Sequence, residues 1–214
     1  MNPTVKVLWF DLSYGQYWVE EISGEKVTSY LGGRGLASMI LARDLMPGID
    51  PLSPENILVI GPGVLTGTFA PTAGRTTVVS KSPATGMFMK SNMGGQWGAE
   101  FRYTGYDLLA LKGKASSKSY ILITDKTVKV EDASKYWGLD VRETTKRLSE
   151  DIGLPRLSIA CIGPAGERGV KFAGLMCSTY HASGRGGLGA VLGSKNIKAI
   201  AVSGSTPIEV VDVR

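Results

Sequence analysis

Cysteine and histidine are scarce in this sequence. Its two cysteines, Cys161 and Cys177, are too few for a disulfide framework. Both lie in apolar surroundings, so we expect them to be reduced core residues. His181 is the only histidine, and without a second histidine or a nearby cysteine pair it does not predict a zinc site.

Long apolar runs and runs of basic residues are also missing. No apolar stretch reaches the roughly 18 residues that predict a transmembrane helix, and residues 1–6 do not resemble a signal peptide. We therefore expect a cytoplasmic protein with no membrane partner. The net charge of +5 suits a phosphate-bearing ligand or an acidic partner. Nucleic acid is not expected, because basic residues form no run and aromatic residues are not interleaved with them.

Catalytic and nucleotide-binding patterns are weak. Glu100 and Asp107 are isolated carboxylates, and no nucleophile is accompanied by a base. No P-loop precedes Gly113-Lys114. The segment Gly184-Arg185-Gly186-Gly187-Leu188-Gly189 matches G-x-G-x-x-G. A dinucleotide site also needs a clear strand just before the motif and an acidic residue about 20 positions on, and we predict neither.

What the sequence does contain is glycine, 28 residues of it, in clusters. Two polar, glycine-dense loops, 92–100 and 182–190, each run into a short amphipathic segment and then an apolar strand. Glycine loops that open a helix favour anions, because no Cβ keeps a phosphate away and the free N–H groups of the first turn point at it. Two such loops indicate one ligand with two anionic groups, or two ligands side by side.

The two loops belong to an internal duplication. Ile60-Gly61-Pro62 recurs as Ile162-Gly163-Pro164. A shift of 91 positions also brings four residues of the first copy onto the second, Gly95, Gly98, Ala99 and Gly113 onto Gly186, Gly189, Ala190 and Gly204. Matches that recur in the same order in both halves predict two similar structural units.

Strands outnumber helices in the predicted secondary structure. Asp140 is expected to cap a helix over 141–151, and Trp97 and Phe101, four residues apart on a short helix over 95–103, are expected in the core. Because helices do not alternate regularly with strands, we predict an α+β fold: one domain of two similar α+β repeats with mixed β-sheets. The predicted strands are 5–11, 16–21, 57–60, 76–81, 87–91, 108–112, 120–124, 128–131, 157–162, 170–178 and 197–203.

Several polar residues border the glycine loops. Arg75 and Arg185 each follow a glycine, and an arginine beside an anion loop is more often a phosphate fork than a solvated side chain. His181 is either a polar loop residue or a contact to a phosphate or ring. Asn92 tolerates unusual backbone angles, so shaping the turn is an alternative role for it.

These residues give the chain a resemblance to a known family. It resembles the N-terminal domain of the tungsten-containing aldehyde:ferredoxin oxidoreductases in a series of ordered blocks that run nearly end to end. The blocks are Gly33-Arg34-Gly35-Leu36-Ala37, Leu52-Ser53-Pro54-Glu55-Asn56, Leu65-Thr66-Gly67, Ala70-Pro71-Thr72, Gly74-Arg75, Lys81-Ser82-Pro83, Asn92 with Gly94-Gly95, Gly98-Ala99-Glu100, Gly105-Tyr106-Asp107, Gly163-Pro164-Ala165-Gly166-Glu167, Gly184-Arg185-Gly186-Gly187 and Gly193-Ser194-Lys195-Asn196.

The resemblance implies a bis-pterin cofactor of tungsten or molybdenum, with a magnesium ion bridging the two pterin phosphates. Asn92 and Ala182 would supply backbone carbonyls near the magnesium, which prefers hard oxygen ligands. They come from equivalent points of the two repeats, so two half-sites facing each other would share the cation. The other cofactor contacts implied by motif match are Arg75, Gly94, Gly184, Arg185 and His181, the last at a place where related sequences can carry arginine.

The resemblance also implies a longer protein. We expect residues 1–206 to form the cofactor-binding domain, and 207–214 to begin the linker to missing C-terminal domains. A [4Fe–4S] cluster needs four cysteine ligands and two exist here, so the cluster belongs to those domains.

The full-length enzyme would oxidise aldehydes to carboxylic acids and pass electrons to ferredoxin, and this domain alone would be inactive. Its expected partners are ferredoxin and the missing domains or a separate subunit, with a homodimer left open. The alternative is a non-catalytic module that presents its glycine loops to a phosphate ligand or a partner subunit.

Overall fold

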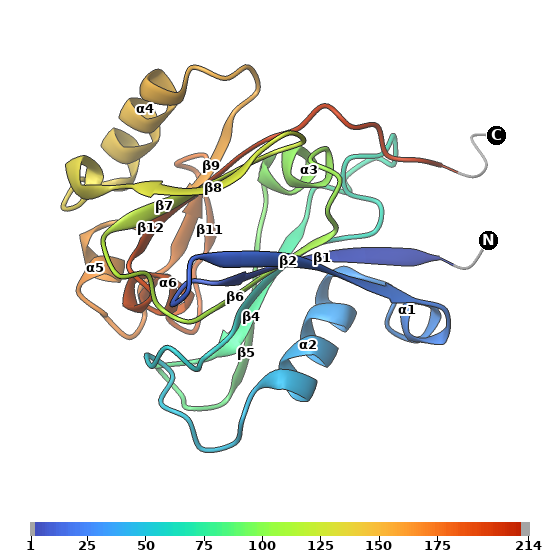
Figure 1. The fold of residues 1–214 in the computed structure, drawn as a ribbon, viewed down its shortest axis with the longest axis horizontal. Coiled ribbons are helices and arrows are strands. Elements are labelled where there is room, and N and C mark those ends of the chain that lie inside the picture. Colours follow the sequence, from blue (N-terminus) through green and yellow to red (C-terminus); the bar gives the residue numbers. More distant parts are fainter. Residues whose placement is uncertain (1–2, 211–214) are drawn as a thin grey trace.

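The computed structural model describes residues 3–210, so the expectations for residues 1–2 and 211–214 lie outside the described part. Two six-stranded sheets face each other (Figure 1). The first sheet has the strand order β2 (Gln16–Ser23), β1 (Thr4–Asp11), β6 (Leu108–Lys112), β3 (Leu58–Pro62), β4 (Thr76–Lys81) and β5 (Phe88–Met93).

The second sheet has the order β8 (Val128–Asp132), β7 (Ser119–Thr124), β12 (Ile197–Ser203), β9 (Ser158–Cys161), β10 (Leu175–Cys177) and β11 (His181–Ser183). The helices are α1 (Glu25–Tyr30), α2 (Gly33–Asp44), α3 (Trp97–Arg102), α4 (Val141–Ile152), α5 (Pro164–Glu167) and α6 (Leu188–Ser194), with a 3₁₀ turn at Ser134–Tyr136. Within residues 3–210, none of these helices combines the length and the apolar character that crossing a bilayer requires.

The two sheets have the same topology, which confirms the predicted duplication. In each, an antiparallel hairpin (β1–β2 or β7–β8) pairs through its first strand, in parallel, with the last strand of the repeat (β6 or β12). Three antiparallel strands then follow in the order β3, β4, β5 or β9, β10, β11. The fold is therefore α+β with mixed sheets, as the sequence predicts.

The main hydrophobic core lies between the sheets. Helices α3 and α6 pack there, each touching strands of both repeats. Trp97 and Phe101 of α3 are fully buried, as predicted, and their rings stack with centroids 5.1 Å apart. The Trp97 indole donates to the Ile200 carbonyl at 2.9 Å, which ties the helix of one repeat to a strand of the other. Figure 1 shows α2 and α4 on the outer sides of the two sheets.

The repeated glycines have repeated structural causes. Gly95 and Gly186 both have left-handed backbone, with φ of +83° and +76°. Gly98 and Gly189 both allow close packing of a short helix: α3 packs against β4 at Gly98, and α6 packs against the residues just before β10 at Gly189. A Cβ at Gly98 would lie 2.1 Å from the Thr76 hydroxyl, and one at Gly189 would lie 2.2 Å from a main-chain oxygen. The sequence match thus reflects a shared packing requirement.

Two buried lysines hold the loops of the domain together. The Lys195 ammonium donates to the carbonyls of Pro54, Asn56 and Gly113 in the first repeat. The Lys198 ammonium pairs with the buried Glu167 carboxylate, which also accepts from the main-chain N–H of Gly138. These contacts give Lys195 and Glu167, both in family-like blocks, structural roles.

Some elements differ from the predicted ones. Helices α1 and α5 and strand β11 were not predicted, since each is at most six residues long and too short to show a period. The predicted strand 170–178 shrinks to Leu175–Cys177. Its first part is a turn, in which Val170 N–H donates to the Ala165 carbonyl and Ala173 N–H to the Val170 carbonyl.

Helix α4 begins as the sequence predicts. The Asp140 carboxylate accepts from the Glu143 N–H at 2.8 Å, and Gly153 ends the helix in left-handed backbone. Because loss of a side-chain N-cap costs about 1 kcal/mol, we expect Asp140→Ala to lower the free energy of unfolding by about that amount. Urea denaturation would measure it, with the exposed Glu150→Ala as the control that changes little. Equal values for the two variants would contradict the cap.

Candidate functional site

The site predicted from the glycine loops lies where the two repeats meet. β5 and β11 are the last strands of their sheets, and they contact each other. An edge strand carries main-chain N–H and C=O groups without a ladder partner on its outer side. We define the seam as residues 88–96 and 181–187, the two edge strands with their glycine loops.

Contacts across the seam run antiparallel. The Ser91 hydroxyl accepts from the Arg185 N–H at 3.4 Å. Further along, a Cβ on Gly94 would lie 2.8 Å from the His181 ring, so the ring lies against that glycine. The two segments therefore run antiparallel, and this register places Asn92 opposite about Gly184 and Ala182 opposite about Met93, so both lie in the same stretch of the seam.

Asn92 and Ala182 occupy equivalent strand positions. Asn92 lies opposite Thr77 and Ala182 opposite Met176, and each is the last residue but one of its strand. Met93, next to Asn92, belongs to the inter-sheet core, so alternation turns the Asn92 side chain away from that core. The same holds for Ala182, because Leu175 and Cys177 flank Met176 and are core residues.

Two predictions about the loops need correction. Asn92 and Ala182 lie in strands, and the glycine loops proper begin after them. A strand, β11, does precede the G-x-G-x-x-G segment, although it is only three residues long and pairs antiparallel with β10. Residues 203–205, at the end of the strand that follows, are not acidic, so the motif still does not define a dinucleotide site.

Glycine is required on both sides of the seam. Gly95, Gly186 and Gly187 all have φ between +74° and +83°, which other residues rarely adopt. The His181 ring spans Gly94 and Gly95, and a Cβ on Gly95 would lie 3.1 Å from its Nδ1 atom. His181 thus joins the second repeat to the first glycine loop, and its imidazole remains exposed.

Both predicted arginines are available to an anion. Arg75 and Arg185 are exposed, and within residues 3–210 neither takes part in an ion pair. Arg75 is held at its main chain, where its carbonyl accepts from the Gly63 N–H at 3.1 Å. The preceding residue, Gly74, approaches the Gly95 carbonyl. Arg75 therefore starts next to the first loop, and Arg185 lies within the second.

Three buried hydroxyls among residues 3–210 have no hydrogen-bond partner, two of them near the seam and the third, that of Ser158, at the start of β9. The hydroxyls of Ser183 and Thr76 are buried and have no hydrogen-bond partner. Ser183 follows Ala182 directly, and Thr76 lies opposite Met93 in the β4–β5 ladder. A buried hydroxyl without a partner costs free energy unless a ligand or water satisfies it.

The two cysteines are free and buried, as predicted. Burial raises the pKa of the Cys161 thiol to about 11, and burial also raises the pKa of Cys177 above its usual range. Cys177 lies under Gly95 in the seam, where it stays a neutral thiol that packs. Among residues 3–210 there is no group of three or more His, Cys, Asp or Glu side chains that could hold a metal ion.

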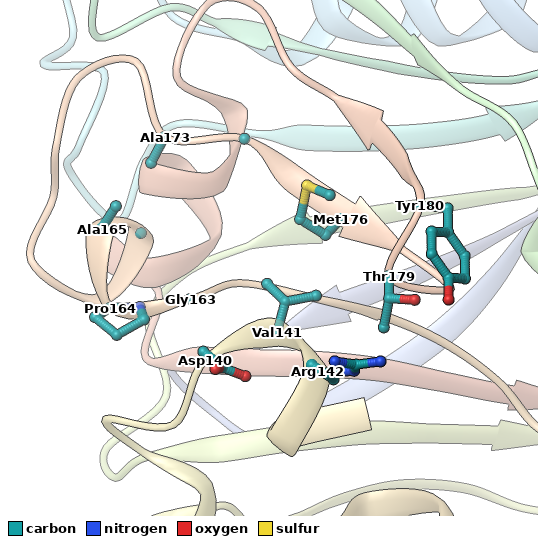
Figure 2. A pocket seen from close by; sticks show the side chains of 12 residues that line it. Asp140, Val141, Arg142, Gly163, Pro164, Ala165, Ala173, Met176, Thr179 and Tyr180 are labelled. Atoms are coloured by element: carbon teal, nitrogen blue, oxygen red, sulfur yellow. The ribbon is translucent and has the colours of Figure 1, made fainter. Parts of the chain in front are cut away.

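A cavity of about 620 Å³ lies beside the second half of the seam and is separate from it. Figure 2 shows Met176, which is opposite Ala182 in the ladder, and Tyr180, which precedes His181, at this cavity. None of the predicted cofactor contacts lines it. The residues that do are Asp140, Val141, Arg142, Gly163, Pro164, Ala165, Gly166, Ala173, Gly174, Met176, Thr179 and Tyr180.

Comparison with known proteins connects this fold to one class of oxidoreductase. The family described as "Aldehyde ferredoxin oxidoreductase, N-terminal domain" matches residues 7–204. The tungsten-containing aldehyde ferredoxin oxidoreductase of Pyrococcus furiosus is 49% identical over 202 residues, which is 94% of this chain and 33% of the relative. The enzyme of the same name from Thermococcus kodakarensis is 47% identical and matches 97% of this chain and 34% of its own length.

A solved structure shares the fold. It is described as the active site complex BamBC of benzoyl coenzyme A reductase with 1,5-dienoyl-CoA. The similar chain in that complex is 36% identical in sequence, with a TM-score of 0.90. The superposition covers 95% of the present chain and 31% of the chain in the complex.

The two-sheet fold is therefore that of an oxidoreductase domain. The chain belongs to the aldehyde ferredoxin oxidoreductase family and corresponds to the N-terminal region of its tungsten-containing members, which confirms the resemblance seen in the sequence. It spans about a third of the length of these relatives.

Proposed function

We propose that the seam holds the phosphate ends of a bis-pterin cofactor of tungsten or molybdenum. One observation carries this proposal: the two equivalent edge strands, β5 and β11, contact each other in antiparallel orientation. Each is followed by a glycine loop, and each loop has an arginine within it or beside it. Two similar half-sites suit two similar phosphate-bearing ligands. The central main-chain carbonyls, at Asn92 and Ala182, would bind a magnesium ion shared by the two phosphates, since magnesium prefers oxygen ligands.

The residues present fit such a ligand. Arg75 and Arg185 offer planar guanidinium groups that match phosphate. Gly94 and Gly184 expose main chain that a side chain would shield. The Thr77 hydroxyl donates to the Asn92 side-chain oxygen at 3.0 Å, which fixes that side chain on the outward face and leaves the edge of the main chain clear.

In the full-length enzyme this chain would bind and orient, while the metal of the bound cofactor supplies the electron-transfer chemistry. The residues of the seam would neutralise phosphate charge and fix the distance between the two half-sites. Oxidation of aldehydes to acids with ferredoxin as acceptor, the [4Fe–4S] cluster and the substrate channel belong in this proposal to polypeptide beyond the present sequence. This chain alone would be inactive, and its location would be cytoplasmic.

Tungsten content tests the proposal. We expect the full-length protein with Arg75→Ala and Arg185→Ala, produced anaerobically with tungstate, to retain less than about a tenth of the wild-type metal, because removing a charge-assisted hydrogen bond to phosphate costs roughly 1.5–3 kcal/mol. Elemental analysis and the fluorescence of released pterin would measure the decrease. Arg147→Ala is the matched control, since Arg147 is exposed on α4 and, within residues 3–210, its ion pair is with Glu143 on the same helix.

Two outcomes would count against the proposal. If the double variant kept its full metal and pterin content, the two arginines would not be cofactor contacts. A folded wild-type protein with neither tungsten nor molybdenum would favour the alternative, a non-catalytic module that presents its glycine loops to another phosphate ligand or a partner subunit.

A further inference from the structure

The loop between β3 and β4 displays large apolar side chains. Phe69 is 100% exposed, and Leu65 and Val64 are 57% and 50% exposed. Leu31, which is 65% exposed, adjoins them, because the next residue, Gly32, touches the Val64 side chain. We call these four residues the apolar platform. A contiguous exposed apolar surface usually marks an interaction site.

The loop between β3 and β4 is fixed by several hydrogen bonds to the rest of the domain and within itself. The Arg102 guanidinium donates to the carbonyls of Val64 and Thr66, and the Tyr103 hydroxyl donates to the Gly67 carbonyl at 2.8 Å. The Thr66 hydroxyl donates to the Ala73 carbonyl at 2.6 Å. A loop fixed by so many hydrogen bonds displays its apolar side chains at little cost in entropy on binding, which is the property of a preformed interface.

The Leu31 side of the platform carries backbone strain. Leu31 has φ of +62° and ψ of −75°, and the Gly32 N–H donates to the Tyr30 carbonyl, which makes a strained γ-turn. Strained residues persist where the surrounding structure fixes them, often at binding sites. Leu31 and Val64 also line a hollow of about 170 Å³, close to the ~150 Å³ of a cavity that takes benzene. One apolar side chain would fit there.

The loop of the platform connects it to residues beside the seam, and the segment after β12 packs against that loop. Its loop leads into Gly74-Arg75. The segment after β12 crosses its base, because Thr206 N–H donates to the Tyr103 carbonyl at 2.8 Å and the Ile208 side chain lies against Gly67. In the tungsten-containing relatives the matched region is N-terminal and is about a third of the protein, so twice as much polypeptide follows it.

We propose that the apolar platform of Leu31, Val64, Leu65 and Phe69 is the docking surface for the polypeptide that follows this region in the full-length protein. That polypeptide contributes apolar side chains, one of which enters the hollow between Leu31 and Val64. The inference rests on family membership and extends beyond cofactor binding, because the contact exists whether or not the seam is loaded.

Photo-crosslinking of the full-length protein tests the inference. Phe69 is replaced by photoreactive benzoylphenylalanine, a change that its complete exposure should permit without loss of folding. After irradiation we expect intrachain crosslinks to residues beyond 214. The control places the same group at Lys126, an exposed residue in the β7–β8 turn, and should yield at least tenfold fewer such crosslinks.

Each outcome of this experiment is decisive. Crosslinks between chains, identified in a mixture of ¹⁵N-labelled and unlabelled protein, would mean that a second copy covers the platform and would overturn the inference. A Phe69 yield no higher than the Lys126 yield would also overturn it. Tungsten is measured on the same samples: intrachain crosslinks in a protein without tungsten would keep this docking surface while contradicting the proposed function.

Discussion

A single methyl group at position 189 is expected to unfold the domain. Gly189 lies in the first turn of α6, and its Cβ would lie 2.2 Å from the carbonyl oxygen and 2.6 Å from the carbonyl carbon of Gly174. Both atoms are main chain and cannot rotate away. The Gly189 N–H also donates to the Ala173 carbonyl at 2.9 Å, which holds the helix against this segment.

The steric effect opposes helix propensity and outweighs it. Alanine favours a helix over glycine by about 1 kcal/mol, whereas separating α6 from the approach to β10 would open the core and disrupt the second half of the seam. We expect Gly189→Ala to lower the free energy of unfolding by more than about 4 kcal/mol, at the upper end for one substitution. Denaturation in urea, or failure to obtain folded protein, would show it.

Gly184→Ala is the matched control. Among the described residues 3–210, a Cβ there would meet the Ala182 side chain alone, at 3.8 Å, and Gly184 is not among the glycines with positive φ. The protein should therefore stay folded, with stability within about 1 kcal/mol of wild type. If Gly189→Ala were as stable as Gly184→Ala, the close packing of α6 would be wrong.

Replacing Lys195 is expected to have the second largest effect on stability. Lys195→Met keeps the apolar part of the side chain and removes the donor to three carbonyls, of which Asn56 and Gly113 lie at 2.5 and 3.0 Å from Nζ. A buried acceptor left without its donor costs about 1–3 kcal/mol. We expect a decrease of about 3 kcal/mol in the free energy of unfolding, measured by urea denaturation at pH 8. Lys126→Met is the exposed control.

The contribution of Lys195 to the free energy of unfolding should increase with pH. Burial lowers the pKa of Lys195 to about 7, below its value in the unfolded chain. Between these two pKa values the unfolded state binds more protons than the folded state, so the contribution of Lys195 to stability rises as pH rises from about 7 to 10.

The stability difference between wild type and Lys195→Met isolates this contribution, because other titrating groups, including both cysteines, are common to the two proteins. The difference should therefore widen between pH 6 and pH 9. A difference that stays constant over this range would show that Lys195 remains charged in the folded protein, because both states would then keep the proton up to about pH 10.

The duplication could be predicted from sequence because its cause is local. Gly95, Gly98 and their counterparts are fixed by positive φ or by a helix touching a strand, and both constraints leave a glycine in the sequence. The shift of 91 positions that aligns the glycines could not reveal that Asn92 and Ala182 are equivalent, because these two residues are 90 positions apart. That offset arises because loop 184–187 is one residue longer than loop 94–96, as the strand and helix bounds show.

The contacts across the seam were beyond sequence reasoning. His181 lies over Gly94 and Gly95, and Arg185 bonds to Ser91, although these partners are about 90 positions apart. Such pairs depend on how two separate sheets face each other, which no short-range pattern encodes. Strand β11 escaped prediction for a related reason, because three residues become a strand only through pairing with β10.

The structural roles of the family-like blocks also emerged only in three dimensions. Glu167 belongs to a family-like block of the sequence, and in the structure its carboxylate is buried against Lys198 and the Gly138 N–H. Lys195 is likewise buried among carbonyls. Residues that stabilise the fold and residues that face a ligand look alike in sequence, and burial separates them.

A crystal structure of the full-length protein, purified anaerobically with tungsten, would decide whether the seam is a cofactor site. We expect two pterin phosphates in the seam, one near Arg75 and one near Arg185, with a magnesium ion between the main-chain carbonyls of Asn92 and Ala182. A cofactor bound elsewhere, or phosphates that do not approach both β5 and β11, would contradict this assignment.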